Sequence, residues 1–354
     1  FVTPPKELQK GGIENAVEGL REALHAEGAT VIDGADLEDE FAIHHFHGLW
    51  NPKHSRTAAQ LRKRGLSYIV SPHGMLEPWA FRNRRWKKLP YFHLIEKGML
   101  KGASALLVTS AMERDNVARL IRHPRVEVIP LGCRDATQPD YETARHSLGW
   151  NSSEKIMLYL SRVDPKKGLD LLVDAIAQAR LQATGWKLVI VGDGPPAYRL
   201  MLEEKIKQLG GSLPPIVWAG PLWGLARWPY LQGADLFCLP THSENFGIAV
   251  LEALCVGTPV LTTTQTPWVD LRSMDGVFIA DPETTSIRQA LEHAEQRISS
   301  GWSQQDRDLL ASWASSNFSW PSLAPKYLDF YHSVASHRLT ASGSPVHRKV
   351  ASES

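Results

Sequence analysis

The sequence predicts an α/β protein of two domains, each built on a parallel sheet. A chain of 354 residues is longer than one hydrophobic core usually serves. Short apolar or β-branched runs alternate with amphipathic helical patterns, which is typical of strand-helix-strand units with parallel strands. This alternation stops once, in a polar stretch at 131–154, and then restarts.

The first series of elements occupies the beginning of the chain. Its expected strands are 30–33, 41–46, 67–71, 105–110 and 126–130, and its expected helices are 12–26, 55–64, 88–102 and 110–122. The opening "FVTPP" reads as the end of a strand entering a turn. We therefore expect part of a first strand to precede Phe1.

The second series follows a polar, strandless linker, which places the boundary between the domains near 133–152. Its expected strands are 155–161, 187–192, 215–220, 235–240 and 259–263, and its expected helices are 168–183, 196–209, 224–232 and 246–256, with further helices over 284–337. Residues 338–354 lack apolar periodicity and are expected to form a disordered tail.

The composition of the chain argues against several classes of protein. Lys and Arg number 39 against 38 Asp and Glu, and this near-neutral balance argues against a nucleic-acid-binding protein. Cys133, Cys238 and Cys255 are too widely spaced for a disulfide framework or a zinc motif, which fits a reducing cytoplasm. No apolar stretch reaches the roughly 18 to 20 residues that span a bilayer, and no signal-peptide pattern opens the chain.

Two acids stand out in the apolar segment "SENFGIAVLEAL" at 243–254. A strand ending at Pro240 leads into a helix at 246–256, so Glu244 lies near the helix N-terminus and Glu252 two turns later. The axial rise between them is about 12 Å at 1.5 Å per residue, too long for the acid pair of a glycosidase. A longer ligand, with a hydroxyl-rich ring at each end of a diphosphate, suits them better. Alternatively, Glu244 caps the helix and Glu252 is merely solvated.

Groups suited to the diphosphate surround these acids. Free N–H groups from about Asn245 to Ile248 carry the positive end of the helix dipole, and Gly247 lets a ligand approach the backbone. Arg162 ends the strand at 155–161, and the basic turn "PKKG" at 165–168 follows it with Lys166 and Lys167. These cations are expected at the same sheet edge as the acids, unless the turn simply faces solvent.

Histidines and a basic aromatic stretch mark the first domain. His44, His45 and His47 are close in sequence, but only His45 and His47 share a strand face, and no acid or cysteine at ligand spacing joins them. We expect no metal site there, and His47 to be an acceptor-side or structural residue. The stretch 79–92, with Trp79 and Arg82, could rest on an anionic membrane, hold a lipid-linked acceptor, or be a solvated face with aromatic anchors packed below.

Several segments resemble family-4 (group 1) retaining glycosyltransferases of the GT-B fold. They are "GGIENAV" (11–17), "HFHGLW" (45–50), "SPHGMLEPWA" (71–80), "SRVDPKKGLDLL" (161–172), "VGDGP" (191–195), "SENFGIAVLEALCVGTPVLTT" (243–263) and "TPW" (266–268). The resemblance covers roughly residues 1–335 and includes the family's two glutamates separated by seven residues. It implies two Rossmann-like domains facing across a cleft. The implied parts are an acceptor-side domain at 1–133, a linker at 134–152, a nucleotide-sugar-binding domain at 153–320, and a helix at 321–337 that crosses back to the first domain.

The resemblance also implies residue roles. Glu252 would bind the ribose, Glu244 a hydroxyl of the donor sugar, and the backbone of Asn245, Phe246, Gly247 and Ile248 the phosphates and sugar. Arg162 and Lys167 would hold the diphosphate without a metal or another cofactor. In the first domain, Gly11 and Gly12 would form a loop close to the phosphate, and His73 would lie against the donor sugar as a catalytic-site residue.

These roles predict a retaining, metal-independent glycosyltransferase. It would move a hexose or deoxyhexose from a nucleoside-diphosphate sugar to a glycan or lipid-linked glycan, in cell-surface polysaccharide synthesis, in the cytoplasm or at the inner face of the membrane. The alternatives are a sugar-nucleotide epimerase or hydrolase on the same architecture, and a non-catalytic nucleotide-sugar-binding protein. A nicotinamide-dependent dehydrogenase is disfavoured, because neither opening unit has a glycine-rich fingerprint followed by a ribose-binding acid.

Overall fold

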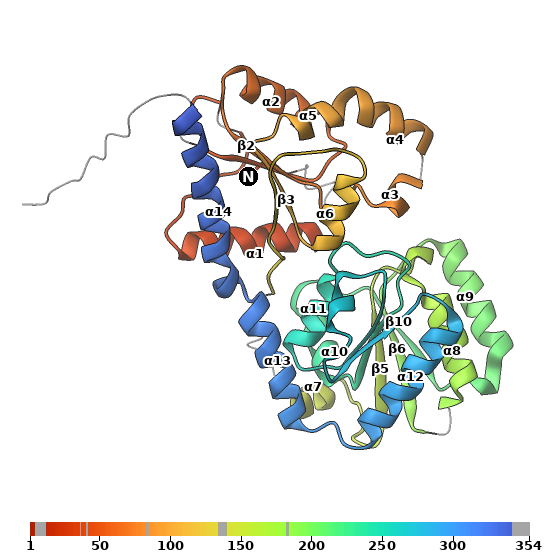
Figure 1. Cartoon of the computed structure of the whole chain (residues 1–354). Helices are drawn as coiled ribbons and strands as arrows, with labels where there is room; N and C mark the ends of the chain where they lie inside the picture. Colours follow the sequence, from red (N-terminus) through yellow and green to blue (C-terminus); the bar gives the residue numbers. More distant parts are fainter. Residues whose placement is uncertain are drawn as a thin grey trace, which may run out of the picture. The chain divides into compact units, whose positions relative to one another are not determined.

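The computed structural model describes residues 1–3, 12–35, 37–39, 42–82, 85–133, 140–181 and 184–341. The chain forms two compact units, Leu131–Ser322 and a second that combines Phe1–Pro130 with the segment from Leu323 onward. Figure 1 shows a sheet flanked by helices in each unit. Among the described residues, none of the helices has the length and apolar character needed to cross a membrane.

The first unit contains a four-stranded parallel sheet in the order β1-β2-β3-β4, and Val2 adds a parallel bridge to Phe46 of β1. The strands are β1 (His44–His47), β2 (Tyr68–Ser71), β3 (Ala105–Val108) and β4 (Val126–Val128). The helices are α1 (Gly12–Ala26), α2 (Pro52–Lys63), α3 (Pro78–Arg82), α4 (Arg85–Tyr91), η2 (Phe92–Glu96), α5 (Lys97–Lys101), α6 (Ala111–Ala118) and α14 (Trp320–Ala341). Phe46, Tyr68 and Leu106 lie in its buried core.

Two predictions for this unit are wrong. Residues 30–33 do not form a strand. In the described part of the chain, the backbone here bonds to Phe1, whose amino group donates to Ile32 O at 2.5 Å and whose carbonyl accepts from the following Gly34 N at 2.8 Å. The single helix expected at 88–102 is divided into α4, the π-helix η2 and α5. Pro90 lies inside α4, and a proline removes a helical hydrogen bond and crowds the preceding turn.

The second unit contains a six-stranded parallel sheet in the order β10-β9-β8-β5-β6-β7. The strands are β5 (Lys155–Leu160), β6 (Trp186–Val191), β7 (Ile216–Gly220), β8 (Leu236–Leu239), β9 (Val260–Thr263) and β10 (Val277–Ala280). The helices are α7 (Tyr141–Ser147), η3 (Pro165–Lys167), α8 (Leu169–Ala179), α9 (Pro196–Leu209), η5 (Gly210–Ser212), η6 (Gly224–Arg227), α10 (Trp228–Gly233), α11 (Ile248–Cys255), η7 (Pro267–Leu271), α12 (Thr284–Ser299) and α13 (Gln304–Phe318).

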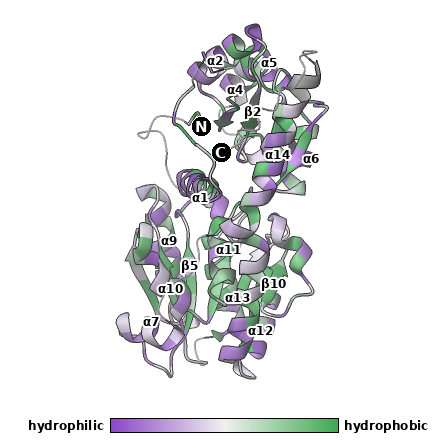
Figure 2. Ribbon diagram, turned by 90° about the vertical axis from the view of Figure 1, so that its left-hand side faces the viewer, coloured by the Kyte–Doolittle hydropathy of each residue, from purple (hydrophilic) through white to green (hydrophobic). Residues whose placement is uncertain are grey.

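Helices cover both faces of this sheet, with α8, α9 and α12 on one face and α10, α11 and α13 on the other (Figure 1). The central strands are therefore apolar along their length rather than alternating. Figure 2 shows β5 in hydrophobic colours and α12 with a mixture of both kinds. Strand order reverses between β5 and β8, and ligands of such sheets usually bind at the carboxyl ends of strands beside this reversal.

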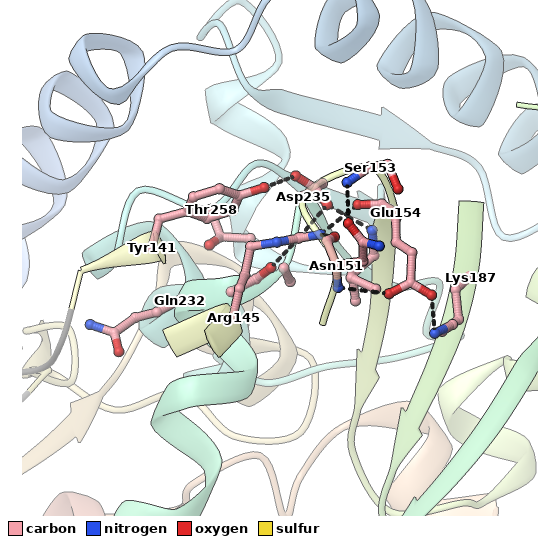
Figure 3. Close-up of polar contacts among 12 residues, drawn as sticks. Tyr141, Arg145, Asn151, Ser153, Glu154, Lys187, Gln232, Asp235 and Thr258 are labelled. Atoms are coloured by element: carbon pink, nitrogen blue, oxygen red, sulfur yellow. Dashed lines mark hydrogen bonds and ion pairs between the residues drawn. The ribbon is translucent and has the colours of Figure 1, made fainter. Parts of the chain in front are cut away.

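A buried ionic network lies at the opposite, amino-terminal edge of the sheet (Figure 3). Arg145 of α7 is 1% exposed. It donates to Asp235 Oδ2 at 3.0 Å and to the carbonyl of Gly233 at 2.9 Å. Asp235 also accepts from Ile156 N at 2.7 Å and from the Tyr141 hydroxyl at 2.7 Å. The network thus attaches α7, the first helix after the linker, to the starts of β5 and β8.

Removal of Arg145 should destabilise the second unit strongly. Arg145→Ala leaves Asp235 buried without its main cation, and loss of one member of a buried pair costs about 3 to 5 kcal/mol. Urea unfolding followed by circular dichroism measures the change. Arg199→Ala, which removes an exposed pair with Glu203, is the matched control and should change the unfolding free energy by less than about 1 kcal/mol. Equal effects of the two substitutions would contradict the role of the network.

Candidate functional site

The loops that follow β5 and β8 meet at the carboxyl edge of the six-stranded sheet. The Thr241 hydroxyl donates to Lys166 O at 2.9 Å, and His242 N donates to the same carbonyl at 2.8 Å. Gly168 approaches Pro240 so closely that a Cβ there would lie 2.0 Å from the Pro240 carbonyl oxygen. These contacts hold η3 against the segment that leads into α11.

Lys167 and Glu244 form an ion pair between these two loops. Both side chains are mostly buried, at 12% and 15% exposure. Burial by itself would raise the pKa of the Glu244 carboxyl, but the ammonium of Lys167, helped by Lys166 and the Asn245 amide, outweighs burial and holds that pKa below its usual value. Glu244 is therefore an ionised hydrogen-bond acceptor at neutral pH.

Helix α11 begins later than the sequence pattern suggests. Gly247 is its N-cap residue, with a left-handed backbone (φ 78°), and no side chain caps the helix. Phe246 precedes it and is fixed by Trp268, whose indole N–H donates to the Phe246 carbonyl at 2.5 Å. The alternative that Glu244 caps this helix is thus excluded, and the first turn of α11 presents its N–H groups and positive dipole end at the sheet edge.

Glu252 pairs with Arg227, a residue that the sequence analysis did not identify. Glu252 is 6% exposed, so the alternative that it is simply solvated is wrong. Burial raises its pKa to about 6, although Arg227 opposes the shift. Arg227 Nε is buried and has no hydrogen-bond partner among the described residues, which leaves a donor for a ligand. The sequence feature that could have identified Arg227 is its position as a lone arginine at the end of the apolar segment "PLWGLAR".

Arg162 lies at the end of β5 with an exposed side chain. Its backbone is held by the Tyr159 hydroxyl, which donates to the Arg162 carbonyl at 3.0 Å. The contacts above bring Lys167 and Glu244 together beside the start of α11, with Glu252 further along that helix, and Arg162 follows β5 at the same edge of the sheet. The set contains cations, free N–H groups and ionisable acids, which together can bind an anion that carries hydroxyl groups.

The first unit holds the remaining candidate residues. His73 Nε2 lies 3.0 Å from His47 Nδ1, so the two predicted histidines touch. Trp79 and Arg82 are in α3, and Gly12 is the first residue of α1, whereas Gly11 lies outside the described residues. In the parts of the chain that the structure describes, no group of three or more His, Cys, Asp or Glu side chains is arranged to hold a metal ion.

Comparison with protein-family models gives two matches. Residues 140–297 match the model described as glycosyl transferases group 1, and residues 34–132 match the glycosyl transferase 4-like domain. Together they cover most of the chain. The chain belongs to the group 1 glycosyl transferases.

Individual relatives of this group 1 member are distant. The D-inositol 3-phosphate glycosyltransferase of Segniliparus rotundus is 32% identical over 142 residues, which is 39% of this chain and 31% of the relative. The first curated relatives are matched over only 31% to 54% of their own length.

Solved structures show the fold of this group 1 member. Sucrose-phosphate synthase from Thermosynechococcus elongatus has a TM-score of 0.75 at 20% identity, covering 95% of this chain and 98% of that one. Anabaena HepE, solved in complex with UDP-glucose, has a TM-score of 0.70 at 17% identity, covering 94% and 99%. The GT-B fold expected from the sequence is confirmed.

Removal of Arg227 should raise the pKa of Glu252 above about 6. Arg227 favours the ionised carboxylate, so Arg227→Met leaves only the effect of burial, which favours the protonated acid. A ¹³C NMR titration of the Glu252 carboxyl measures the shift. Arg288→Met, which removes an exposed helical pair with Glu292, should leave the Glu252 titration unchanged. A fall in the Glu252 pKa in Arg227→Met would show that the pair has been assigned wrongly.

Proposed function

We propose that the chain transfers a hexose or deoxyhexose from a nucleoside-diphosphate sugar to a hydroxyl of a glycan or lipid-linked glycan, with retention at the anomeric carbon. The observation that carries the proposal is the pair of buried acids, Glu244 and Glu252, on either side of the first turn of α11, each held by its own cation. This pattern matches a ligand with two hydroxyl-bearing rings joined by a diphosphate. The family membership and the likeness to a structure solved with UDP-glucose support it.

The roles follow from the chemistry of each group. Glu252 accepts hydrogen bonds from the ribose and Glu244 from the donor sugar, while the amides at the start of α11 face the diphosphate. Arg162 and Lys167 stabilise the negative charge that grows on the departing diphosphate, so the reaction requires no divalent metal. The acceptor attacks on the face from which the diphosphate leaves, and a phosphate oxygen of the leaving group takes the acceptor proton. In the first unit, His73 is assigned to hydrogen bonding with a sugar hydroxyl.

A donor screen tests this proposal directly. Uridine, guanosine and adenosine diphosphate sugars are each mixed with the protein, and the shift in its thermal unfolding midpoint is measured, because a ligand of the folded state raises that midpoint. Radiolabelled donors that bind are then followed with glycan and lipid-linked acceptors, with and without a metal chelator. Transfer that survives chelation is the expected result.

Other outcomes would favour the rival functions. Consumption of the donor without an acceptor, giving free sugar or an epimer, would indicate a hydrolase or epimerase. Thermal stabilisation by a donor without transfer to any acceptor would indicate a binding protein. Absence of stabilisation by every donor would refute the proposal.

Substitution of the cations should separate catalysis from folding. Lys167→Ala and Arg162→Ala each remove one positive charge that would face the leaving group and should lower kcat by about 100-fold or more. The unfolding midpoint should change little in Arg162→Ala, whose side chain is exposed, whereas Lys167→Ala leaves Glu244 without its main cation and should lower the midpoint. Lys205→Ala, which removes a cation paired with Asp174 elsewhere in the second unit, is the matched control. Wild-type turnover in the double variant Arg162→Ala/Lys167→Ala would overturn the assignment.

We also propose that the first unit rests on an anionic membrane surface through α4 and η2, a region that begins and ends later than the predicted 79–92. The exposed residues there are apolar or basic: Trp86 is 74% exposed and Leu94 83%, and Lys87 lies over the Trp86 ring at 4.7 Å. Glu96 is the single acid between 85 and 101, and it is buried. Phe81 packs inward against Trp50 and Phe92 instead. Exposed apolar side chains with a lysine beside them suit the interface of anionic lipid.

Vesicle sedimentation tests this surface. Trp86→Ser and Leu94→Ser together should weaken binding to phosphatidylglycerol-containing vesicles by about tenfold or more, since each removes a large exposed apolar group. Added salt should weaken wild-type binding because it screens the lysines. Leu309→Ser alters a residue that is 65% exposed in the second unit and should have no effect. Unchanged binding of the double variant would exclude α4 and η2 as the contact.

A further inference from the structure

His45 and His47 of β1 and His73, two residues after β2, form a row of rings, of which the first two are buried and the third half-buried. The His45 and His47 ring centroids are 3.9 Å apart, and the His47 and His73 rings stack at 5.3 Å with an interplanar angle of 20°. His45 is tied at both nitrogens, with Nδ1 2.9 Å from the Tyr331 hydroxyl and Nε2 2.8 Å from Ser71 Oγ. These two contacts hold the His45 ring in place beside the His47 ring.

His47 and His73 are joined differently. One hydrogen bond of 3.0 Å connects His47 Nδ1 to His73 Nε2. The outer nitrogens, His47 Nε2 and His73 Nδ1, are buried without a hydrogen-bond partner among the described residues. Each is thus a polar atom whose hydrogen bond must come from a ligand or from water.

Burial keeps both rings neutral. It lowers the pKa of His73 to about 4 and that of His47 well below its usual value, and neighbouring histidines add to the His47 shift. A neutral imidazole carries one N–H, and the bond between the rings uses one proton. If His47 Nδ1 donates, then His73 must carry its own proton on Nδ1. If His73 Nε2 donates, then His47 carries its proton on Nε2. Both rings therefore always have the same tautomer, and one outer nitrogen donates while the other accepts.

The backbone of His73 is held as firmly as its ring. His73 has a left-handed backbone (φ 50°), which is rare for a residue with a side chain, and Gly74 follows with φ 75°. The Glu113 carboxylate fixes this turn, because it accepts from Gly74 N at 2.6 Å and from Thr109 N at 2.7 Å. Such strain persists only where the surrounding contacts specify it, and it is commonly found at ligand-binding positions.

We propose that His47 is the positioning residue of His73, and that the two rings act as one hydrogen-bonding unit toward a neutral hydroxyl-bearing ligand. His73 Nδ1 makes the hydrogen bond to a hydroxyl of that ligand, while His47 sets the plane of the His73 ring and couples its tautomer to the occupancy of His47 Nε2. This inference rests on the proposed glycosyl transfer. It adds a residue that acts through His73 without touching the donor.

Kinetics of two His47 variants test the positioning role. His47→Phe keeps a ring against His45 but removes the bond to His73, and kcat should fall about tenfold, the worth of one neutral hydrogen bond. His47→Asn places an amide near the position of Nδ1 and should recover most of that loss. The KM for the donor should change by less than about twofold in both, because the loss concerns the transition state. His25→Phe, at an exposed position in α1, is the control.

Tautomers provide a readout that does not depend on activity. Long-range ¹H–¹⁵N NMR of the ¹⁵N-histidine-labelled full chain, assigned with His47→Asn and His73→Asn, distinguishes Nδ1–H from Nε2–H rings. Both rings should be neutral at pH 7 and show the same tautomer.

Several results would overturn the inference. Wild-type kcat in His47→Phe, or no recovery in His47→Asn, would leave glycosyl transfer standing and remove the role of His47. Opposite tautomers, or a charged ring at pH 7, would do the same. If instead the wild-type protein transfers no sugar, the proposed function fails, while the NMR spectrum still decides whether the pair behaves as one unit.

Discussion

Direct contact between main chains at the carboxyl edge of the six-stranded sheet is the constraint on which the candidate site depends. A Cβ on Gly168 would lie 2.0 Å from Pro240 O, and one on Gly194 would lie 1.7 Å from Val163 O. Neither position can carry a side chain without separating the loops. Because the loops touch, Lys167 reaches Glu244 although 77 positions separate the two residues in sequence. The glycines therefore determine the electrostatics of the site, even though they carry no charge.

Glu252 of α11 and Glu244 of the loop before it have the same side chain, but their carboxyl groups have different pKa values. Burial disfavours ionisation of both, yet the pKa of Glu244 falls below its usual value whereas that of Glu252 rises to about 6. The difference arises because Glu244 faces two lysines and a backbone amide, while Glu252 has Arg227 alone. Each acid is thus paired with a cation, and Arg162 and the N–H groups at the start of α11 add positive charge at the same sheet edge.

Local patterns predicted the fold well, and they placed the candidate residues of the second unit at one sheet edge, because both features are encoded locally. Glu244, Gly247 and Glu252 lie in one strand-loop-helix segment, and parallel strand order brings Arg162 and Lys167 to the same edge. Features that depend on distant partners were missed. Arg227 contacts Glu252 from a different loop, and His47 contacts His73 from a neighbouring strand. The expected strand at 30–33 failed for a related reason, since β-branched residues favour a strand only where a partner strand is available.

The contacts of α14 show why the row formed by His45, His47 and His73 could not be predicted from the sequence alone. Tyr331 of α14 contacts His45 across 286 positions of sequence, and Tyr327 of the same helix donates to Pro130 O at 3.1 Å. The Tyr331 contact places a neutral hydroxyl against His45. The groups that shift the pKa of His45 and His47 include the amino group of Phe1 but no carboxylate. A carboxylate in the place of Tyr331 would favour a charged imidazole. The histidine row of the first unit therefore offers neutral hydrogen-bonding groups, whereas the sheet edge of the second unit combines acids with cations.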